Sequence, residues 1–207
     1  MAEKIFRYFP SLTTDQKEKI KLLQPLYEKW NTMINVISRK DMDNIFEHHV
    51  LHSLAIAKII SFRSGTRILD VGTGGGFPGL PLAILNPDAE FTLLDSIGKK
   101  IKVVTTISAE LGIDNIRPMV QRVEKQEEEY DFVIGRAVIE FKKFVSLTMK
   151  NISKNGFNKL MNGILYLKGG DLAAELAPFT SRVVTWNISE FFSEPYFKAK
   201  KIVYLPA

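Results

Sequence analysis

The sequence predicts an α/β fold in which a helical segment precedes a doubly wound, mostly parallel sheet. Up to about residue 60, apolar residues recur at the three- and four-residue steps of a helix. After a turn at Ser64-Gly65, short β-like runs alternate with helical stretches, and this alternation requires crossover connections between parallel strands. The chain has 207 residues, 45% of them hydrophobic, which is enough for one domain with a sizeable core.

The helical segment is expected to start at Thr14 and Asp15, which are suited to cap a helix. Pro25 is expected to kink or break this helix, because proline lacks the amide donor that the helix needs. A second helix is predicted to begin near Asp41. We expect residues 1–62 to form a helical extension and residues 63–207 to form the sheet domain.

Seven strands and four helices are predicted in the sheet domain. The strands are expected at 66–71, 90–95, 116–120, 131–135, 163–168, 182–188 and 201–205. The helices are expected at 80–85, 99–111, 141–151 and 172–177. Because no helix separates the last two strands, we expect them to pair antiparallel.

Cysteine is absent, which excludes a disulfide scaffold, a thiolate metal site and a cysteine nucleophile. The first ten residues contain Glu3, Lys4 and Arg7 and no apolar stretch of signal-peptide length. No apolar run approaches the roughly 20 residues of a membrane span. The sequence therefore predicts a soluble, cytoplasmic protein without a membrane partner.

The net charge of +5 is unevenly distributed. Residues 1–135 hold 17 basic and 18 acidic side chains, whereas residues 136–207 hold 11 basic and 5 acidic ones. This excess in the last third favours a polyanionic partner. A solvated, lysine-rich surface would explain it equally well.

The most informative motif is the glycine-rich run from Asp70 to Gly79, which follows the first strand and opens a helix. Gly74, Gly76 and Gly79 satisfy the dinucleotide pattern G-x-G-x-x-G. Starting at Asp70, the same run spells D-x-G-x-G-x-G, which resembles the first motif of S-adenosylmethionine (SAM) methyltransferases. We favour SAM, because a carboxylate suits its cationic methionine end and would lie beside a pyrophosphate without benefit.

Two further sites fit an adenosine ligand. Asp95 ends the second strand, where a carboxylate can accept both ribose hydroxyls. NAD would be served equally well there, and a helix cap before Gly98 is the alternative role. The run Arg122-Val123-Glu124 follows the third strand and is suited to adenine, although it could equally begin a surface loop.

Taken together, these residues resemble the bacterial RsmG (GidB) family, in one order and over essentially the whole chain. Three departures from the family pattern are His52 for the acid of H-x-x-D-S-L, Ile37 for a threonine and Gly135 for a serine. The runs that carry the resemblance are Asp70 to Gly79 with Pro81-Leu82, Leu93-Leu94-Asp95-Ser96, Arg122-Val123-Glu124, Gly135-Arg136-Ala137, Trp30-Asn31, Asn35, His49 and Leu167-Lys168-Gly169.

The resemblance implies a Rossmann-like, seven-stranded SAM methyltransferase sheet with an N-terminal helical extension. It implies SAM as cofactor, small-subunit ribosomal RNA as partner, and methylation of N7 of one guanine, guanine-527 in standard 16S numbering. No metal is implied. By resemblance the SAM contacts are Gly72, Phe77, Val123, Glu124 and Arg136, with Asp95 on the ribose, and Asp70, Gly74 and Ser96 complete the candidate cofactor set.

The predicted chemistry needs alignment rather than a reacting side chain. Guanine N7 carries a lone pair and no proton, so its attack on a sulfonium methyl requires no general base. Without cysteine, the covalent route to C5 of pyrimidines is excluded. Gly135-Arg136-Ala137 also differs from the D/N-P-P-Y/F tetrapeptide that resembles exocyclic-amine methyltransferases. Arg136 is therefore predicted to position cofactor or RNA, with a surface salt bridge as the alternative.

Basic and aromatic side chains supply the RNA-facing candidates. The histidines His48, His49 and His52 lack a third ligand at metal spacing, so we expect a polar contact with the sheet domain instead of a metal site. The aromatic residues could stack on an unpaired base or belong to the core. The candidates are Lys99, Lys100 and Lys168, then Lys102, Lys142, Lys143, Lys198, Lys200 and Lys201, and the aromatic residues Phe191, Phe192, Tyr196 and Phe197.

Two other classes of function stay open. A dinucleotide-dependent oxidoreductase would need an acid or base beside the nicotinamide, and none is evident. A non-catalytic RNA-binding protein could keep a vestigial cofactor pocket, but the intact Asp70, Gly72, Gly74 and Asp95 argue against it.

Overall fold

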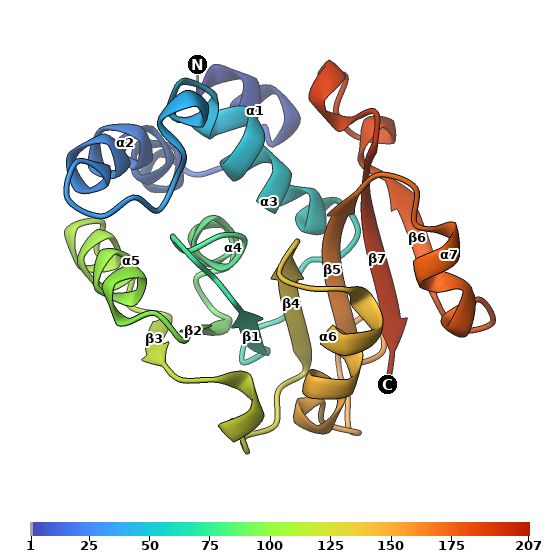
Figure 1. Ribbon diagram of the computed structural model, residues 1–207. Coiled ribbons are helices and arrows are strands. Elements are labelled where there is room, and N and C mark those ends of the chain that lie inside the picture. The colour runs from blue at the N-terminus through green and yellow to red at the C-terminus, as the bar shows by residue number, and fades with distance from the viewer. Residues whose placement is uncertain (1) are drawn as a thin grey trace.

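A seven-stranded sheet with the order β3-β2-β1-β4-β5-β7-β6 forms the centre of the protein (Figure 1). The computed structural model describes residues 2–207 except for the side chain of Arg39. The pairs from β3 to β5 are parallel, whereas β7 is antiparallel to both β5 and β6. The predicted α/β class and the antiparallel pairing of the last two strands are confirmed. The strands are β1 Arg67–Val71, β2 Glu90–Asp95, β3 Ile116–Val120, β4 Phe132–Arg136, β5 Gly163–Gly169, β6 Val184–Asn187 and β7 Lys200–Pro206.

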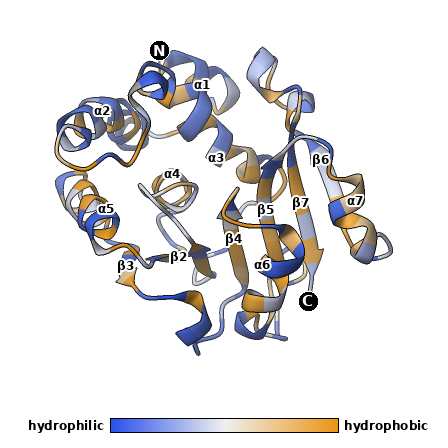
Figure 2. Ribbon diagram, in the orientation of Figure 1, coloured by the Kyte–Doolittle hydropathy of each residue, from blue (hydrophilic) through white to orange (hydrophobic). Residues whose placement is uncertain are grey.

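The central strands are nearly continuous apolar runs because helices cover both faces of the sheet. Figure 2 shows this hydrophobic character along β4, β5 and β7. The edge strands β3 and β6 are more exposed. Strand β6 is shorter than the predicted 182–188, since the amides of Arg182 and Val183 bond the Phe179 carbonyl in a turn.

Helices on the two faces bury alternate residues of the same strands. Ile68 of β1 lies in the hydrophobic cluster with the N-terminal helices, α4 and α5, and Leu69 lies in the cluster with α6 and α7. Two of the predicted helices are shorter than expected, because each ends in a 3₁₀ turn. The two shortened helices are α6 (Phe141–Thr148), which continues into η5 (Met149–Asn151), and α7 (Ala173–Leu176), which continues into η6 (Ala177–Phe179). The other elements of the sheet domain are the helices α4 (Gly79–Leu85) and α5 (Gly98–Glu110) and the 3₁₀ turns η4 (Val123–Lys125), η7 (Ile188–Glu190) and η8 (Pro195–Phe197).

The N-terminal extension begins with α1 (Glu3–Tyr8) and α2 (Thr14–Asn31). Thr13, rather than Thr14, caps α2 in a reciprocal pair with Gln16. Helix α2 continues through Pro25, so the helix break considered at this residue does not occur. Leu23 and Tyr27 on either side of the proline are fully buried, and this packing offsets the lost hydrogen bond.

The helix predicted near Asp41 has a composite hydrogen-bond pattern. It runs through a 3₁₀ segment, η1 (Arg39–Asn44), a π-helical segment, η2 (Ile45–Leu51), then α3 (His52–Leu54) and η3 (Ala55–Lys58). Within η2, the consecutive residues His48 and His49 both bond the Asp41 carboxylate. Such π-turns are frequent at functional sites.

The extension packs directly on the sheet domain. Its buried residues share one hydrophobic cluster with α4, α5 and one face of the sheet. Gln16 donates to the Ile84 carbonyl, and Tyr8 bonds Ser193 and Glu194 near the other end of the chain. The division at residues 62 and 63 stays a prediction. Among residues 2–207, no helix has the length and apolar character to cross a membrane.

Candidate active site

A cavity of about 470 Å³ opens at the carboxyl ends of β1, β2 and β4. The strand order reverses between β1 and β4, and open α/β sheets bind their ligands at such a reversal. The cavity wall combines backbone from the glycine-rich turn with side chains from five later segments. It is formed by Val71, Gly72, Leu94, Asp95, Ser96, Lys100, Gln121, Arg122, Val123, Glu124, Arg136, Ala137, Val138, Ile139, Lys143, Phe144, Leu147 and Thr148.

Gly72 must be glycine for two reasons. Its φ of +68° lies in the left-handed region, which residues with a Cβ rarely adopt. A Cβ at this position would also lie 2.7 Å from Cγ1 of Val138, which packs directly against Gly72. The turn therefore leaves backbone exposed to a ligand at the place where Val138 approaches it.

Asp70 lies beneath the turn and is fully buried. Its Oδ2 accepts hydrogen bonds from the Thr73 hydroxyl at 2.7 Å and the Gly79 amide at 2.8 Å. Burial raises the pKa of Asp70 to about 7, although these two hydrogen bonds and Arg136 favour the charged form. Its Oδ1 is buried and has no hydrogen-bond partner among the described residues.

Asp95 connects the second strand to the turn. Oδ2 accepts from the Gly74 amide at 3.0 Å, and Oδ1 accepts from the Ile97 amide at 2.9 Å. The bond to Ile97 forms a local turn before α5 but is not the helix cap considered as the alternative, because Ile97 is the N-cap residue and no side chain caps α5. Each carboxylate oxygen still has a free lone pair, so this turn and a ribose contact are compatible.

Arg136 ends β4 and extends toward the N-terminal extension. Its Nη1 donates to the His48 carbonyl at 3.1 Å, and its Nη2 bonds Nδ1 of His49 at 2.9 Å. The surface salt bridge considered for Arg136 is not formed in the described part of the chain. Burial lowers its pKa from the usual value, and the guanidinium remains a cation without a carboxylate partner.

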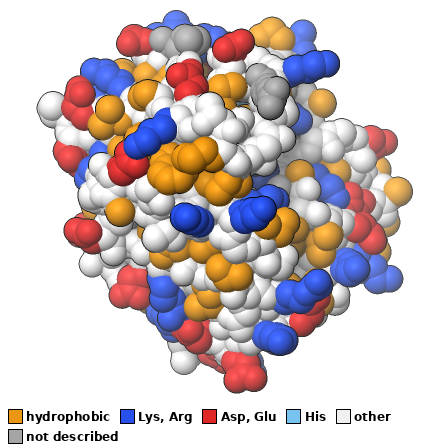
Figure 3. Space-filling model, turned by 60° about the vertical axis from the view of Figure 1, so that its left-hand side comes forward, with side chains coloured by type: hydrophobic (Ala, Val, Ile, Leu, Met, Phe, Trp, Pro, Cys, Tyr) orange, Lys and Arg blue, Asp and Glu red, His pale blue; other side chains and the backbone are white. Residues whose placement is uncertain are grey.

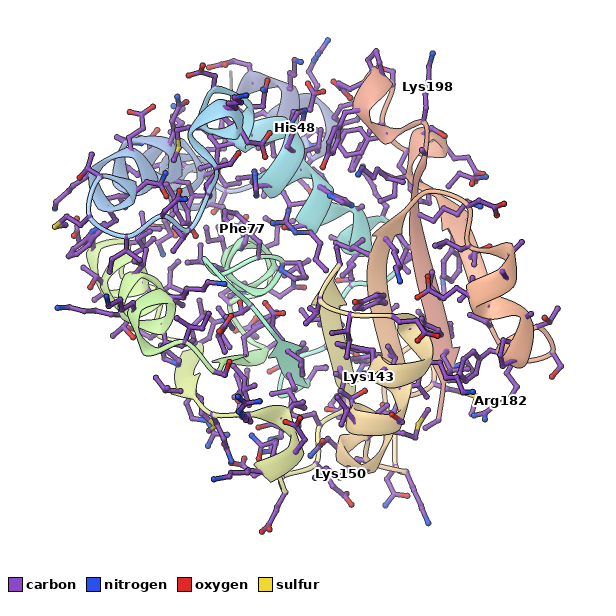
Figure 4. All side chains as sticks on the ribbon, viewed as in Figure 1. His48, Phe77, Lys143, Lys150, Arg182 and Lys198 are labelled. Carbon is purple, nitrogen blue, oxygen red and sulfur yellow. The ribbon has the colours of Figure 1, made fainter. Side chains whose placement is uncertain are left out.

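The aromatic ring of Phe77 lies against one face of this guanidinium. The Arg136 carbon Cζ lies 5.1 Å from the Phe77 ring centroid, within cation–π range. Phe77 in turn stacks on Tyr27, whose hydroxyl donates to the Gly75 carbonyl. Figure 4 labels Phe77 in the glycine-rich turn, His48 in η2 and Lys143 in α6.

The comparisons with known proteins agree with this geometry. The family model described as rRNA small subunit methyltransferase G (GidB) matches residues 16–196. The chain belongs to this family. The protein named ribosomal RNA small subunit methyltransferase G from Cytophaga hutchinsonii is 52% identical over 203 residues, which cover 98% of both chains. The protein of the same name from Bacteroides thetaiotaomicron is 48% identical over 202 residues, again covering 98% of both.

Solved structures share the fold of this rRNA small subunit methyltransferase G family member. A SAM-dependent methyltransferase from Aquifex aeolicus aligns with a TM-score of 0.56 and 13% identity, covering 83% of this chain and 100% of that one. A mutant of MtNAS in complex with S-adenosylmethionine aligns with a TM-score of 0.57 and 14% identity, covering 93% and 76%. The chain thus has the Rossmann-like fold of SAM methyltransferases.

The cavity brings together six of the nine cofactor candidates that were inferred from the motif and the family resemblance. Asp70, Gly74 and Phe77 lie outside the wall and hold the turn, Asp95 and Arg136 in place. The sequence reasoning missed the apolar part of the wall contributed by α6. This part of the wall could have been predicted, because α6 directly follows β4, the strand that ends in Arg136. The six candidates in the wall are Gly72, Asp95, Ser96, Val123, Glu124 and Arg136.

The three main RNA-facing lysines differ in their surroundings. Lys100 lines the cavity, and Lys99 is exposed beside it at the start of α5. Lys168 instead forms an ion pair with Glu175, which also accepts the amide of Phe141 at the start of α6. Through Glu175, Lys168 thus connects β5 with α7 and with the start of α6. On the face shown in Figure 3, basic side chains are distributed together with acidic ones.

The aromatic candidates mostly belong to the core. Phe192 and Phe197 are buried in the hydrophobic cluster, so of the two roles considered for them the core role is confirmed. Tyr196 is half-buried and stacks on His48 with a centroid distance of 3.8 Å. His52 is buried against Tyr196 and Phe197. The described residues contain no group of three or more metal-ligating side chains.

Proposed function

We propose that this protein transfers a methyl group from SAM to N7 of a guanine in 16S ribosomal RNA, guanine-527 in standard numbering, in the cytoplasm. The cavity at the reversal of strand order carries the proposal, because it joins Gly72, Asp95, Glu124 and Arg136 at one edge of the sheet. Membership of a family whose curated relatives are named ribosomal RNA small subunit methyltransferase G supports the substrate class.

The residues around the cavity fit SAM. Asp95 has a free lone pair on each oxygen for the ribose hydroxyls, and η4 offers Val123 and Glu124 to the adenine. The unpaired guanidinium of Arg136 suits the carboxylate of the methionine moiety. Asp70 lies outside the cavity wall and holds the turn through its bonds to Thr73 and Gly79.

The reaction follows from this arrangement without a general base. SAM, when bound, supplies an electrophilic methyl group on its sulfonium. The chain holds and orients the reactants, and alignment of this kind contributes roughly 7–11 kcal/mol to a two-reactant step. Val138, Phe144 and Leu147 form an apolar side of the cavity.

Labelled SAM and 16S ribosomal RNA, both free and in small subunits, test the proposal. We expect one labelled guanine, methylated at N7 and identified by cleavage at the modified base. Arg136→Ala should abolish most transfer while retaining the fold, and Lys159→Ala at an exposed, distant position should match the wild type. Label at another atom, or RNA binding without transfer, would overturn the proposal. Binding of NAD without binding of SAM would favour the oxidoreductase alternative.

A further inference from the structure

We propose that His49, held by Asp41, is a positioning residue that fixes the guanidinium of Arg136 at the cavity. The inference rests on the proposed function, because its effect is measured through methyl transfer. It extends the site to a hydrogen-bonded chain of three side chains from η1, η2 and β4. Two of them lie in the extension and only Arg136 borders the cavity.

The donors and acceptors in this chain have one consistent assignment. Arg136 can only donate, so Nδ1 of His49, 2.9 Å from Nη2, must accept. The imidazole proton is then on Nε2, which donates to Oδ2 of Asp41 at 2.5 Å. Asp41 thereby selects the tautomer of His49 that can accept from Arg136.

His49 must be neutral to accept this bond. Burial and the neighbouring Arg136 lower its pKa to about 4, so at neutral pH the imidazole carries no charge. Asp41 is fixed on its other side as well, since its Oδ1 bonds Nδ1 of His48 at 2.5 Å. Tyr196 stacks on His48 and covers this side of the network.

Few other contacts fix the guanidinium. The Phe77 ring supports one face, and the His48 carbonyl accepts from Nη1. Without His49, Arg136 would keep one hydrogen bond and could rotate above Phe77. Since the proposed catalysis depends on alignment, such rotation should slow transfer more than it weakens RNA binding.

Two substitutions of His49 separate positioning from packing. His49→Phe keeps an aromatic ring and removes both hydrogen bonds. His49→Gln keeps one acceptor for Arg136 and one donor for Asp41. We expect His49→Phe to lower kcat about ten- to hundredfold, the effect of losing one hydrogen bond to a charged group, with an unchanged KM for RNA. His49→Gln should restore most of the loss.

The outcomes distinguish the inference from the proposed function. A wild type that transfers no methyl group contradicts the proposed function. A wild type that transfers methyl, together with a folded His49→Phe variant of equal kcat, contradicts the positioning role. If His49→Phe does not fold, the imidazole ¹⁵N shifts of the wild type decide, with the proton on Nε2 supporting the role and the proton on Nδ1 overturning it.

Discussion

The amide of Gly74 donates a hydrogen bond to Oδ2 of Asp95 over 3.0 Å. This bond joins the turn after β1 to the end of β2, the two places where the motif analysis located the cofactor. Asp95 therefore has two tasks, since it shapes the turn and offers free lone pairs to the cavity. The bond therefore holds the glycine-rich turn and the carboxylate in place together.

Replacing Asp95 tests this double role. Asp95→Ala removes a charged acceptor and the partner of the Gly74 amide, so the Kd for S-adenosylhomocysteine should rise about ten- to hundredfold. Asp95→Asn keeps one acceptor oxygen and should show a smaller loss. Titration calorimetry gives the Kd values, and Asp88→Ala, at an exposed acid before β2, is the matched control. An unchanged Kd for Asp95→Ala would remove this residue from the site.

Substitution of Gly72 should damage both stability and binding. The left-handed backbone makes Gly72→Ala less stable by about 1–2 kcal/mol, and the new Cβ would meet Cγ1 of Val138 at 2.7 Å. Adding Val138→Ala should relieve the clash and leave the backbone strain. We therefore expect thermal unfolding to rank the wild type first, then Val138→Ala/Gly72→Ala, then Gly72→Ala. A double variant that is no more stable than Gly72→Ala would mean that the Val138 side chain moves away from the new Cβ without an energetic cost.

The motifs that could be predicted from the sequence are local ones. The turn and the run around Val123 each follow a strand and Asp95 ends one, and parallel strands present their carboxyl ends on one edge. The bond from Arg136 to His49 confirms the polar contact that was expected between the histidines and the sheet domain. The place of Asp41 in this hydrogen-bonded chain, and the choice of Arg136 as the partner, could not be predicted, because only tertiary packing brings these residues together. Its acidic member, Asp41, was expected only to begin a helix.

Two other expectations depended on packing that the sequence does not show. The motif suggested Asp70 as a direct cofactor ligand, yet its Oδ2 holds the turn from beneath. Lys168 was a candidate to face RNA because of its charge, yet Glu175 lies close enough to pair with it. In both cases the residue type was compatible with function, but local folding of the glycine-rich turn or of α7 brings a bonding partner from within nine positions of the residue.

The stability of the protein should depend on the titration of Asp70. Burial raises its pKa from 3.8 to about 7, so the folded state binds a proton more tightly than the unfolded state. Its contribution to stability is complete below about pH 3.8 and is lost as pH rises through about 7. Asp70→Asn resembles the protonated form and lacks this loss. The difference in Tm, wild type minus Asp70→Asn, should fall between pH 4 and pH 7.5 and then level off. A difference independent of pH would contradict the raised pKa.

The salt dependence of RNA binding should separate Lys143 from Lys168. Lys143 lines the cavity, whereas Lys168 is paired with Glu175. If Lys143 neutralises an RNA phosphate, Lys143→Ala should reduce the slope of log K against log salt concentration by about 0.7–0.9. Lys168→Ala should leave that slope unchanged and lower Tm, because it leaves Glu175 without its cation. Filter binding over a range of salt concentrations measures the slopes, with Lys159→Ala as the control. A reduced slope for Lys168→Ala would mean that Lys168 contacts an RNA phosphate after all.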